Sequence, residues 1–153
     1  INEEEILMAI EVFKAETTAL GGLKVNCKSR EFEFTLDEPK NLGGTNTGMN
    51  PVEALLNSLG ACLVIVAQSY ARVKKINLKS FKVNLEGELD PDGFRYINPN
   101  AKKGFSKISV TFHVKADNTE QEIKDFIEFV EATCPVHDTI TNSPVFESKI
   151  ITE

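Results

Sequence analysis

The chain has 153 residues, 41% of them hydrophobic, with a formal net charge of −6 at pH 7. This length suits one domain with its own hydrophobic core, and we expect residues 1–153 to form a single domain. Acidic and basic residues are interspersed without a basic block, which argues against nucleic acid or an anionic membrane as a partner.

Three cysteines are an odd number and make a poor disulfide framework, so we expect reduced thiols and a cytoplasmic protein. We expect no apolar run to reach the roughly 18–20 residues of a membrane span, and no signal-peptide pattern is visible. Because the sequence starts at Ile1 rather than Met, we expect residues to precede it.

The N-terminal third predicts a three-stranded meander. Gly21 and Gly22 separate two alternating runs, and tight hairpin turns need the positive φ that glycine tolerates. Three side chains fall on one face of the second strand, namely Leu23, Val25 and Cys27. Apolar residues alternate with polar ones along a third strand, at Phe32, Phe34 and Leu36.

A glycine-rich loop then leads into a long apolar helix. Asn50 is a favourable N-cap and Pro51 a favourable first helical residue, so we expect a helix from Pro51 to about Lys75. Charged side chains occur only near its two ends, and apolar residues lie on nearly every face between them. Such a helix is buried all round, which indicates burial against a second subunit.

The rest of the chain predicts two more strands, a second helix and a closing strand. The two strands alternate in polarity around residues 81–85 and 108–114, with a turn at residues 91–93. Thr119 and Glu122 form a capping box that begins the second helix. Its apolar stripe is Ile123, Phe126, Ile127 and Val130, and Cys134 extends it. Pro135 ends this helix or starts a short new one, and residues 143–152 read as a strand.

The three cysteines differ in their local setting. Cys27 alternates with core residues and reads as a small hydrophobic side chain in a sheet. Cys62 lies in the middle of the apolar helix, where a thiol has a raised pKa and is inert unless a cation or a helix N-terminus intervenes. If residues 135–140 form a helical turn, Cys134 sits at its N-terminus, which favours the thiolate. Local chemistry therefore ranks Cys134 as the more acidic thiol.

Cys62 and Cys134 both project from helices toward the core, so their sulfurs are able to meet. Packed helices lie about 8–10 Å apart, and two thiols that meet in a reducing compartment indicate a redox pair rather than a structural staple. Two alternatives stay open. Cys62 by itself could be a buried hydrophobic residue like Cys27, or Cys62, Cys134 and His137 could hold a metal ion, although no second ligand pair supports this. Otherwise His137 reads as a surface residue at the end of a turn.

The motif "GGTNTGMNPVEALLNSLGAC", followed by "CPVHDT" about seventy residues later, resembles the OsmC/Ohr family of thiol-dependent hydroperoxide reductases. The resemblance covers nearly the whole chain. It implies an α+β fold with antiparallel sheets around two long central helices, in an intertwined homodimer with its active sites at the subunit interface.

The resemblance also assigns roles. It implies that Cys62 attacks a small hydroperoxide, that Cys134 resolves the resulting sulfenic acid as a disulfide, and that an external thiol resets the pair without any cofactor. Relatives carry a glutamate directly after the helix-opening proline, where this chain has Val52. The nearest carboxylate is Glu53, about half a turn away from Cys62 around the helix. Relatives also have an activating arginine, and Arg30 is the nearest one upstream.

A different class of function remains open beside the enzyme. The chain could be a non-enzymatic dimer that binds a small apolar ligand, or that uses its cysteines as a redox sensor. Turnover of an organic hydroperoxide, and its loss on substitution of Cys62, distinguishes these alternatives.

Overall fold

The structure is a computed structural model that describes residues 10–152. Contacts along the chain divide it into two compact units, the first ending at Ala54 and the second beginning at Leu55. Each unit is described by itself below, and a single domain over residues 1–153 stays a prediction.

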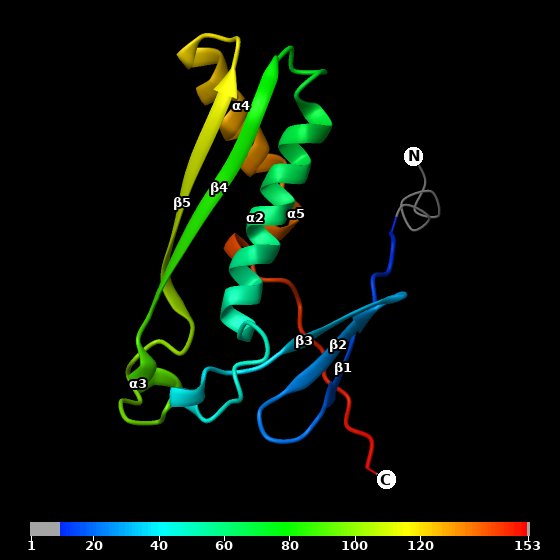
Figure 1. The fold of residues 1–153 in the computed structure, drawn as a ribbon, viewed down its shortest axis with the longest axis vertical. Helices are drawn as coiled ribbons and strands as arrows, with labels where there is room; N and C mark the ends of the chain where they lie inside the picture. Colours follow the sequence, from blue (N-terminus) through cyan, green and yellow to red (C-terminus); the bar gives the residue numbers. More distant parts are fainter. Residues whose placement is uncertain (1–9, 153) are drawn as a thin grey trace. The chain divides into compact units, whose positions relative to one another are not determined.

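The first unit contains the predicted meander (Figure 1). Its antiparallel strands are β1 (Glu16–Ala19), β2 (Val25–Ser29) and β3 (Phe32–Leu36), in the order β1-β2-β3. Gly21 and Gly22 have φ of 99° and 57°, so the turn between β1 and β2 needs the freedom of glycine, as expected. Arg30, with φ of 55°, forms the turn between β2 and β3, and its guanidinium carbon lies 5.0 Å from the centre of the Phe32 ring.

The glycine-rich loop that follows is organised around the carboxylate of Asp37, which is 1% exposed. This carboxylate accepts hydrogen bonds from the backbone N–H and the hydroxyl group of both Thr45 and Thr47, and from the N–H of Glu38. Led by the Thr45 hydroxyl, these donors hold the pKa of Asp37 well below its usual range, against the opposing effect of burial. The Asp37 N–H also donates to the Met49 carbonyl at 3.1 Å, which closes the loop.

Helix α2 (Pro51–Tyr70) begins with the expected Asn50 cap. The Glu53 N–H donates to Asn50 Oδ1 at 2.9 Å, and the Asn50 N–H donates to Glu53 Oε2 at 2.8 Å, a reciprocal capping box. Regular helix stops at Tyr70 rather than at about Lys75. Helical turns nevertheless continue until Lys75, whose φ is 57°, and the Ile76 N–H then donates to the Ala71 carbonyl at 2.8 Å. A left-handed residue followed by a hydrogen bond that spans five residues is a Schellman motif. It ends the helical turns five residues beyond the regular helix.

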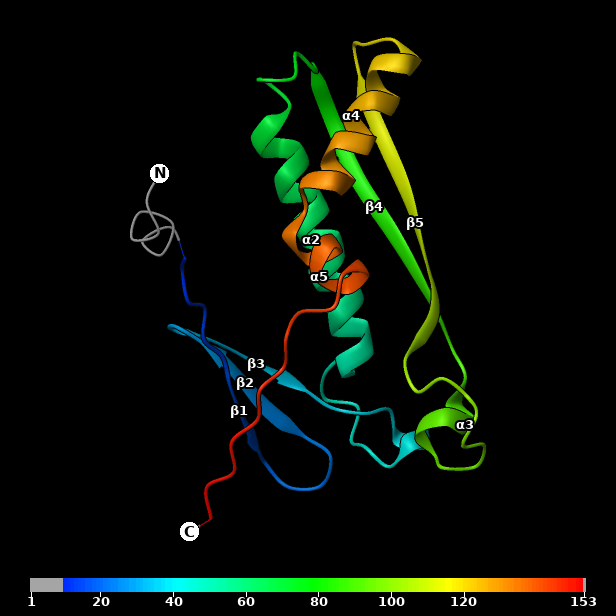
Figure 2. The ribbon, with the colours of Figure 1, turned by 180° about the vertical axis from the view of Figure 1, so that it is seen from behind.

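The second unit packs helices on one side of a two-stranded antiparallel hairpin (Figures 1 and 2). The hairpin consists of β4 (Leu78–Leu89) and β5 (Phe105–Ala116), with the short α3 (Pro91–Phe94) in the connection, and α4 (Glu120–Thr133) and α5 (Pro135–Thr141) follow. The predicted capping box of α4 is present, with the Glu122 N–H donating to Thr119 Oγ1 at 3.2 Å. The predicted apolar stripe of α4 faces the core, where Phe126 and Val130 are buried.

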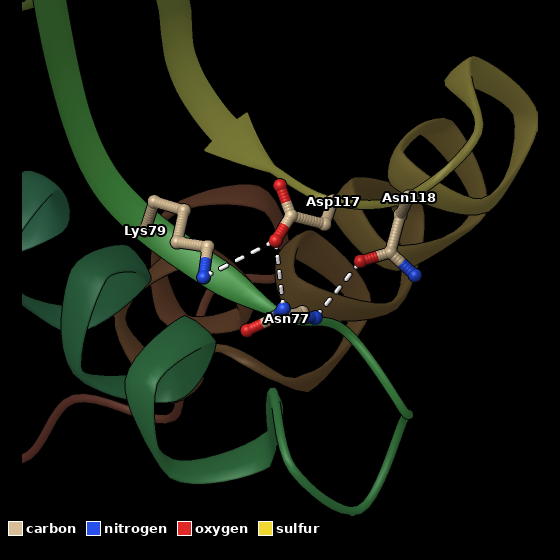
Figure 3. A network of polar contacts seen from close by, with 4 residues as sticks. All are labelled: Asn77, Lys79, Asp117 and Asn118. Atoms are coloured by element: carbon tan, nitrogen blue, oxygen red, sulfur yellow. Dashed lines mark hydrogen bonds and ion pairs between the residues drawn. The ribbon is translucent and has the colours of Figure 1, made fainter.

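A polar network holds the beginning of β4 to the end of β5 (Figure 3). Asp117 Oδ2 accepts from Asn77 Nδ2 at 2.9 Å and pairs with Lys79 Nζ at 3.1 Å. Asn118 Oδ1 accepts from the Asn77 N–H, and Asn118 Nδ2 donates to the Lys75 carbonyl at 3.1 Å. Asn118 therefore holds both sides of the left-handed turn that connects α2 to β4.

Helix α2 is not buried on every side within the chain described. Leu59, Leu63 and Val66 belong to the core, whereas Leu55 is 40% exposed and Ile65 is 61% exposed. Among residues 10–152, α2 is the one helix with the length and composition to cross a membrane, so the expectation that no apolar run is long enough is wrong. Length and composition do not place a helix in a membrane, because core helices of soluble proteins share them.

The prediction of a closing strand over residues 143–152 is also wrong. None of the described strands pairs with this segment, and its side chains are open to solvent, with Val145 92% and Phe146 82% exposed. Alternating apolar residues supply strand propensity, but a strand forms only where another backbone edge completes its hydrogen bonds.

Candidate redox site

Cys62 and Cys134 lie in direct contact. Cys62 is in the middle of α2, Cys134 is at the junction of α4 and α5, and their sulfurs are 2.7 Å apart although 72 residues separate them. Both are free thiols. The expectation that the two side chains face each other is confirmed. A disulfide bond is about 2.05 Å long, so a small side-chain rotation brings these sulfurs to bonding distance.

The two thiols differ in access to solvent. Cys134 is 0% exposed, and it lies in a core cluster with Leu63 and Val130, which are also fully buried. Cys62 packs against the edge of this cluster and remains half-buried. Cys62 is therefore the more accessible residue of the pair, and Cys134 is closed to solvent.

Cys134 is the N-cap of α5, as the sequence suggested, but it is not made acidic there. Its sulfur accepts a hydrogen bond from the His137 N–H at 3.4 Å, which favours the thiolate. Burial nevertheless raises the pKa of Cys134, and its hydrogen bond to Cys62 raises it further. The expectation that the start of α5 makes Cys134 favour the thiolate is thus wrong, because desolvation inside the core outweighs the donors there.

The other candidate residues occupy different surroundings. Glu53 forms the capping box of α2 and lies about two and a half helical turns before Cys62. Arg30 is a hairpin-turn residue in the first unit and is paired with Glu31 at 3.9 Å. A catalytic role for Glu53 stays a prediction. No role was predicted for Asp37, although an aspartate followed by threonines eight and ten residues later is a pattern that the sequence shows.

A cavity of about 400 Å³ opens one helical turn from each thiol. Leu59, three residues before Cys62, and His137, three residues after Cys134, both line it. His137 is therefore a half-buried cavity residue rather than a surface residue at a turn end. The rest of the wall is mixed: it contains the apolar residues Phe105, Ile108, Val110 and Ile140 and the polar or charged residues Ser106, Lys107, Glu131 and Thr141.

Within residues 10–152, no three histidine, cysteine or acidic side chains are grouped so that they could hold a metal ion. The metal alternative, with Cys62, Cys134 and His137 as ligands, therefore has no support in this part of the chain. One more accessible thiol in contact with one buried thiol is instead suited to redox chemistry. In such a pair the first sulfur is oxidised to a sulfenic acid, and the second sulfur displaces its hydroxyl group to form a disulfide.

Comparisons with known proteins agree with one another. A family model described as OsmC-like protein matches residues 44–149, which include both cysteines. A hydroperoxide reductase of Mycoplasma genitalium is 33% identical over 128 residues, covering 82% of this chain and 84% of the relative. A hydroperoxide reductase of Mycoplasma pneumoniae is 35% identical over 114 residues, covering 73% and 74%. The crystal structure of an OsmC-like protein from Mycoplasma pneumoniae superimposes with a TM-score of 0.76 at 29% identity, covering 87% of this chain and 89% of that one.

Proposed function

The chain belongs to the OsmC-like protein family, and from that premise we propose that it reduces hydroperoxides through the thiols of Cys62 and Cys134. The single observation that carries the proposal is the contact of 2.7 Å between one half-buried and one buried sulfur. The names of its two curated relatives, both hydroperoxide reductases, support the same activity.

The proposed reaction has three steps. The Cys62 thiolate attacks the terminal oxygen of the hydroperoxide, the O–O bond breaks, and the alcohol leaves after taking a proton, so that Cys62 becomes a sulfenic acid. The Cys134 thiol then attacks the oxidised sulfur, and water leaves as the disulfide forms. Two equivalents of an external thiol return two electrons and restore both cysteines.

Access supports this order of attack. A hydroperoxide arriving from solvent meets Cys62, because Cys134 has no exposed surface. Cys134 needs no such access, since its target is already in contact with it. Its raised pKa slows direct attack by Cys134 on peroxide, because the thiolate is the nucleophile.

The cavity one turn from the thiols supports an organic substrate. Half of its lining residues are apolar, among them Leu59, Phe105 and Ile108, and an alkyl tail packed against them gains about 0.8 kcal/mol for each CH₂ group that it buries. We therefore propose that organic hydroperoxides are reduced in preference to hydrogen peroxide. Comparing kcat/KM for the two substrates tests this, and equal or better turnover of hydrogen peroxide would contradict it.

We also propose that the working form is a homodimer. The exposed side of α2 carries apolar residues, and a groove of about 420 Å³ runs between Ala61, Val64 and Ile65 on α2 and Val83 and Leu85 on β4. A second copy of the chain would cover this surface and remove the exposed apolar side chains of α2 from water.

The proposed function is tested by following the consumption of cumene hydroperoxide with dithiothreitol as reductant. The parent should turn over the peroxide well above the uncatalysed thiol background. Cys62→Ser should fall to that background, while Cys27→Ser, the matched control, should keep the parent rate. Background activity in the parent would instead favour the non-enzymatic ligand binder or redox sensor.

A further inference from the structure

We propose that an external thiol opens the Cys62–Cys134 disulfide at the sulfur of Cys62, and that Cys134 is the leaving group, received by the N–H of His137. This inference rests on the proposed function, because it concerns the disulfide formed in the peroxide reaction. It specifies the sulfur that the reductant must reach.

Access determines which sulfur is attacked. In thiol–disulfide exchange a thiolate attacks one sulfur of the bond and displaces the other, so the attacked sulfur must be open on the side away from its partner. Cys134 is 0% exposed and is enclosed by the core cluster that contains Leu63 and Val130. Cys62, in contact with Cys134, is half-buried and is the more accessible of the two residues. Only Cys62 therefore offers an approach from solvent.

Access, and not acidity, makes Cys134 the group that departs, and the start of α5 offsets part of the cost of charge on its buried sulfur. The His137 N–H lies 3.4 Å from the Cys134 sulfur and points at it as an N-cap donor. When the disulfide breaks, negative charge appears on this sulfur in a setting where burial opposes it. A donor already in place stabilises that charge without any rearrangement.

The electrons balance over two thiol equivalents. The first thiolate bonds to the Cys62 sulfur, and the electron pair of the broken S–S bond passes to Cys134, which takes a proton. This leaves a mixed disulfide on Cys62. A second thiolate attacks the outer sulfur of that mixed disulfide, releasing the oxidised reductant as its own disulfide and restoring the Cys62 thiolate.

The first test maps the mixed disulfide. In a Cys27→Ser background the protein is oxidised with one equivalent of cumene hydroperoxide or, separately, with diamide. It is then mixed with 2-mercaptoethanol, quenched in acid at short times, alkylated and digested for mass spectrometry. At early times the mercaptoethanol adduct should lie on the Cys62 peptide and the alkyl group on the Cys134 peptide, in at least ten-fold excess over the reverse pattern. Equal amounts, or the reverse, would overturn the inference.

The two oxidants separate this inference from the proposed function. If diamide forms the disulfide but the hydroperoxide does not, the proposed function fails, and the diamide sample still decides which sulfur is attacked. If both oxidants form the disulfide and the adduct is found on Cys134, the proposed function stands and this inference alone is wrong.

A second test examines the leaving group. His137→Pro removes the N–H that faces Cys134, whereas His137→Ala keeps it, so the pair isolates one backbone donor from the loss of the imidazole. Proline at this position breaks no hydrogen bond within α5, because the N–H groups of a first helical turn have no partner inside the helix. Reduction of the disulfide by 2-mercaptoethanol should be about five-fold slower in the proline variant than in the alanine variant. Equal rates in two folded variants would show that the His137 N–H does not assist.

Discussion

Cys134→Ser isolates the role of the buried thiol. Serine is among the most favourable N-cap residues, so the hydroxyl should accept the His137 N–H and keep α5 in place. The two side chains are nearly the same size, and the fully buried position remains filled. The variant should therefore retain the fold and lose only the sulfur that faces Cys62.

The contact distance sets the expected size of the effect. The sulfurs are 2.7 Å apart before any reaction, an arrangement in which the second step is intramolecular. Well-oriented intramolecular groups react as if their partner were present at about 10⁵ M or more, whereas an external thiol is supplied at about 1 mM. Even a small part of this advantage makes the Cys62 sulfenic acid at least about 1,000-fold longer-lived in the variant than in the parent.

The lifetime can be measured by stopping the peroxide reaction at increasing delays with a dimedone-type probe and quantifying the labelled Cys62 peptide. The variant should label strongly and, under excess peroxide, should proceed to the sulfinic acid, since no neighbouring thiol intercepts it. Cys27→Ser should behave like the parent. A variant whose labelling decays as fast as that of the parent, without over-oxidation, would refute a resolving role for Cys134.

Three further predictions concern stability and assembly. Leu63→Ala, at a fully buried site in α2, should lower the free energy of unfolding by about 2–5 kcal/mol, measured by urea denaturation. Because the pKa of Asp37 is depressed in the folded state, its ionised carboxylate stabilises the fold fully above about pH 4, and this stabilisation is lost as the pH falls further. Asp37→Asn should therefore be less stable than the parent at pH 7. In acid titrations its free energy of unfolding should depend less on pH below about 4. Ile65→Lys, at a side chain 61% exposed on α2, should give a monomer by sedimentation, whereas Ile97→Lys, at a side chain 65% exposed, should sediment like the parent.

Features that depend on neighbouring residues could be read directly from the sequence. Polarity alternation located β1 to β3, and the paired glycines located their first turn, because positive φ is a property of the local backbone. The capping box of Thr119 and Glu122 marked the start of α4 for the same reason, since both hydrogen bonds close within three residues. The end of α2 was located less closely from the sequence, because its left-handed residue is Lys75 and not the glycine that usually marks such an end.

Other features were decided by contacts between distant segments, and only the tertiary structure could show them. Spacing suggested that Cys62 and Cys134 face each other, but the contact itself depends on how α4 and α5 pack against α2. The acidity of Cys134 followed its burial and not its place at a helix start, because desolvation depends on everything that surrounds the sulfur. Residues 143–152 have the polarity pattern of a strand but pair with no other strand within the described chain. The depressed pKa of Asp37 likewise depends on hydrogen bonds from Thr45 and Thr47, which the loop brings to its carboxylate. Local propensity is a property of a few consecutive residues, whereas burial and pairing are properties of the packed chain.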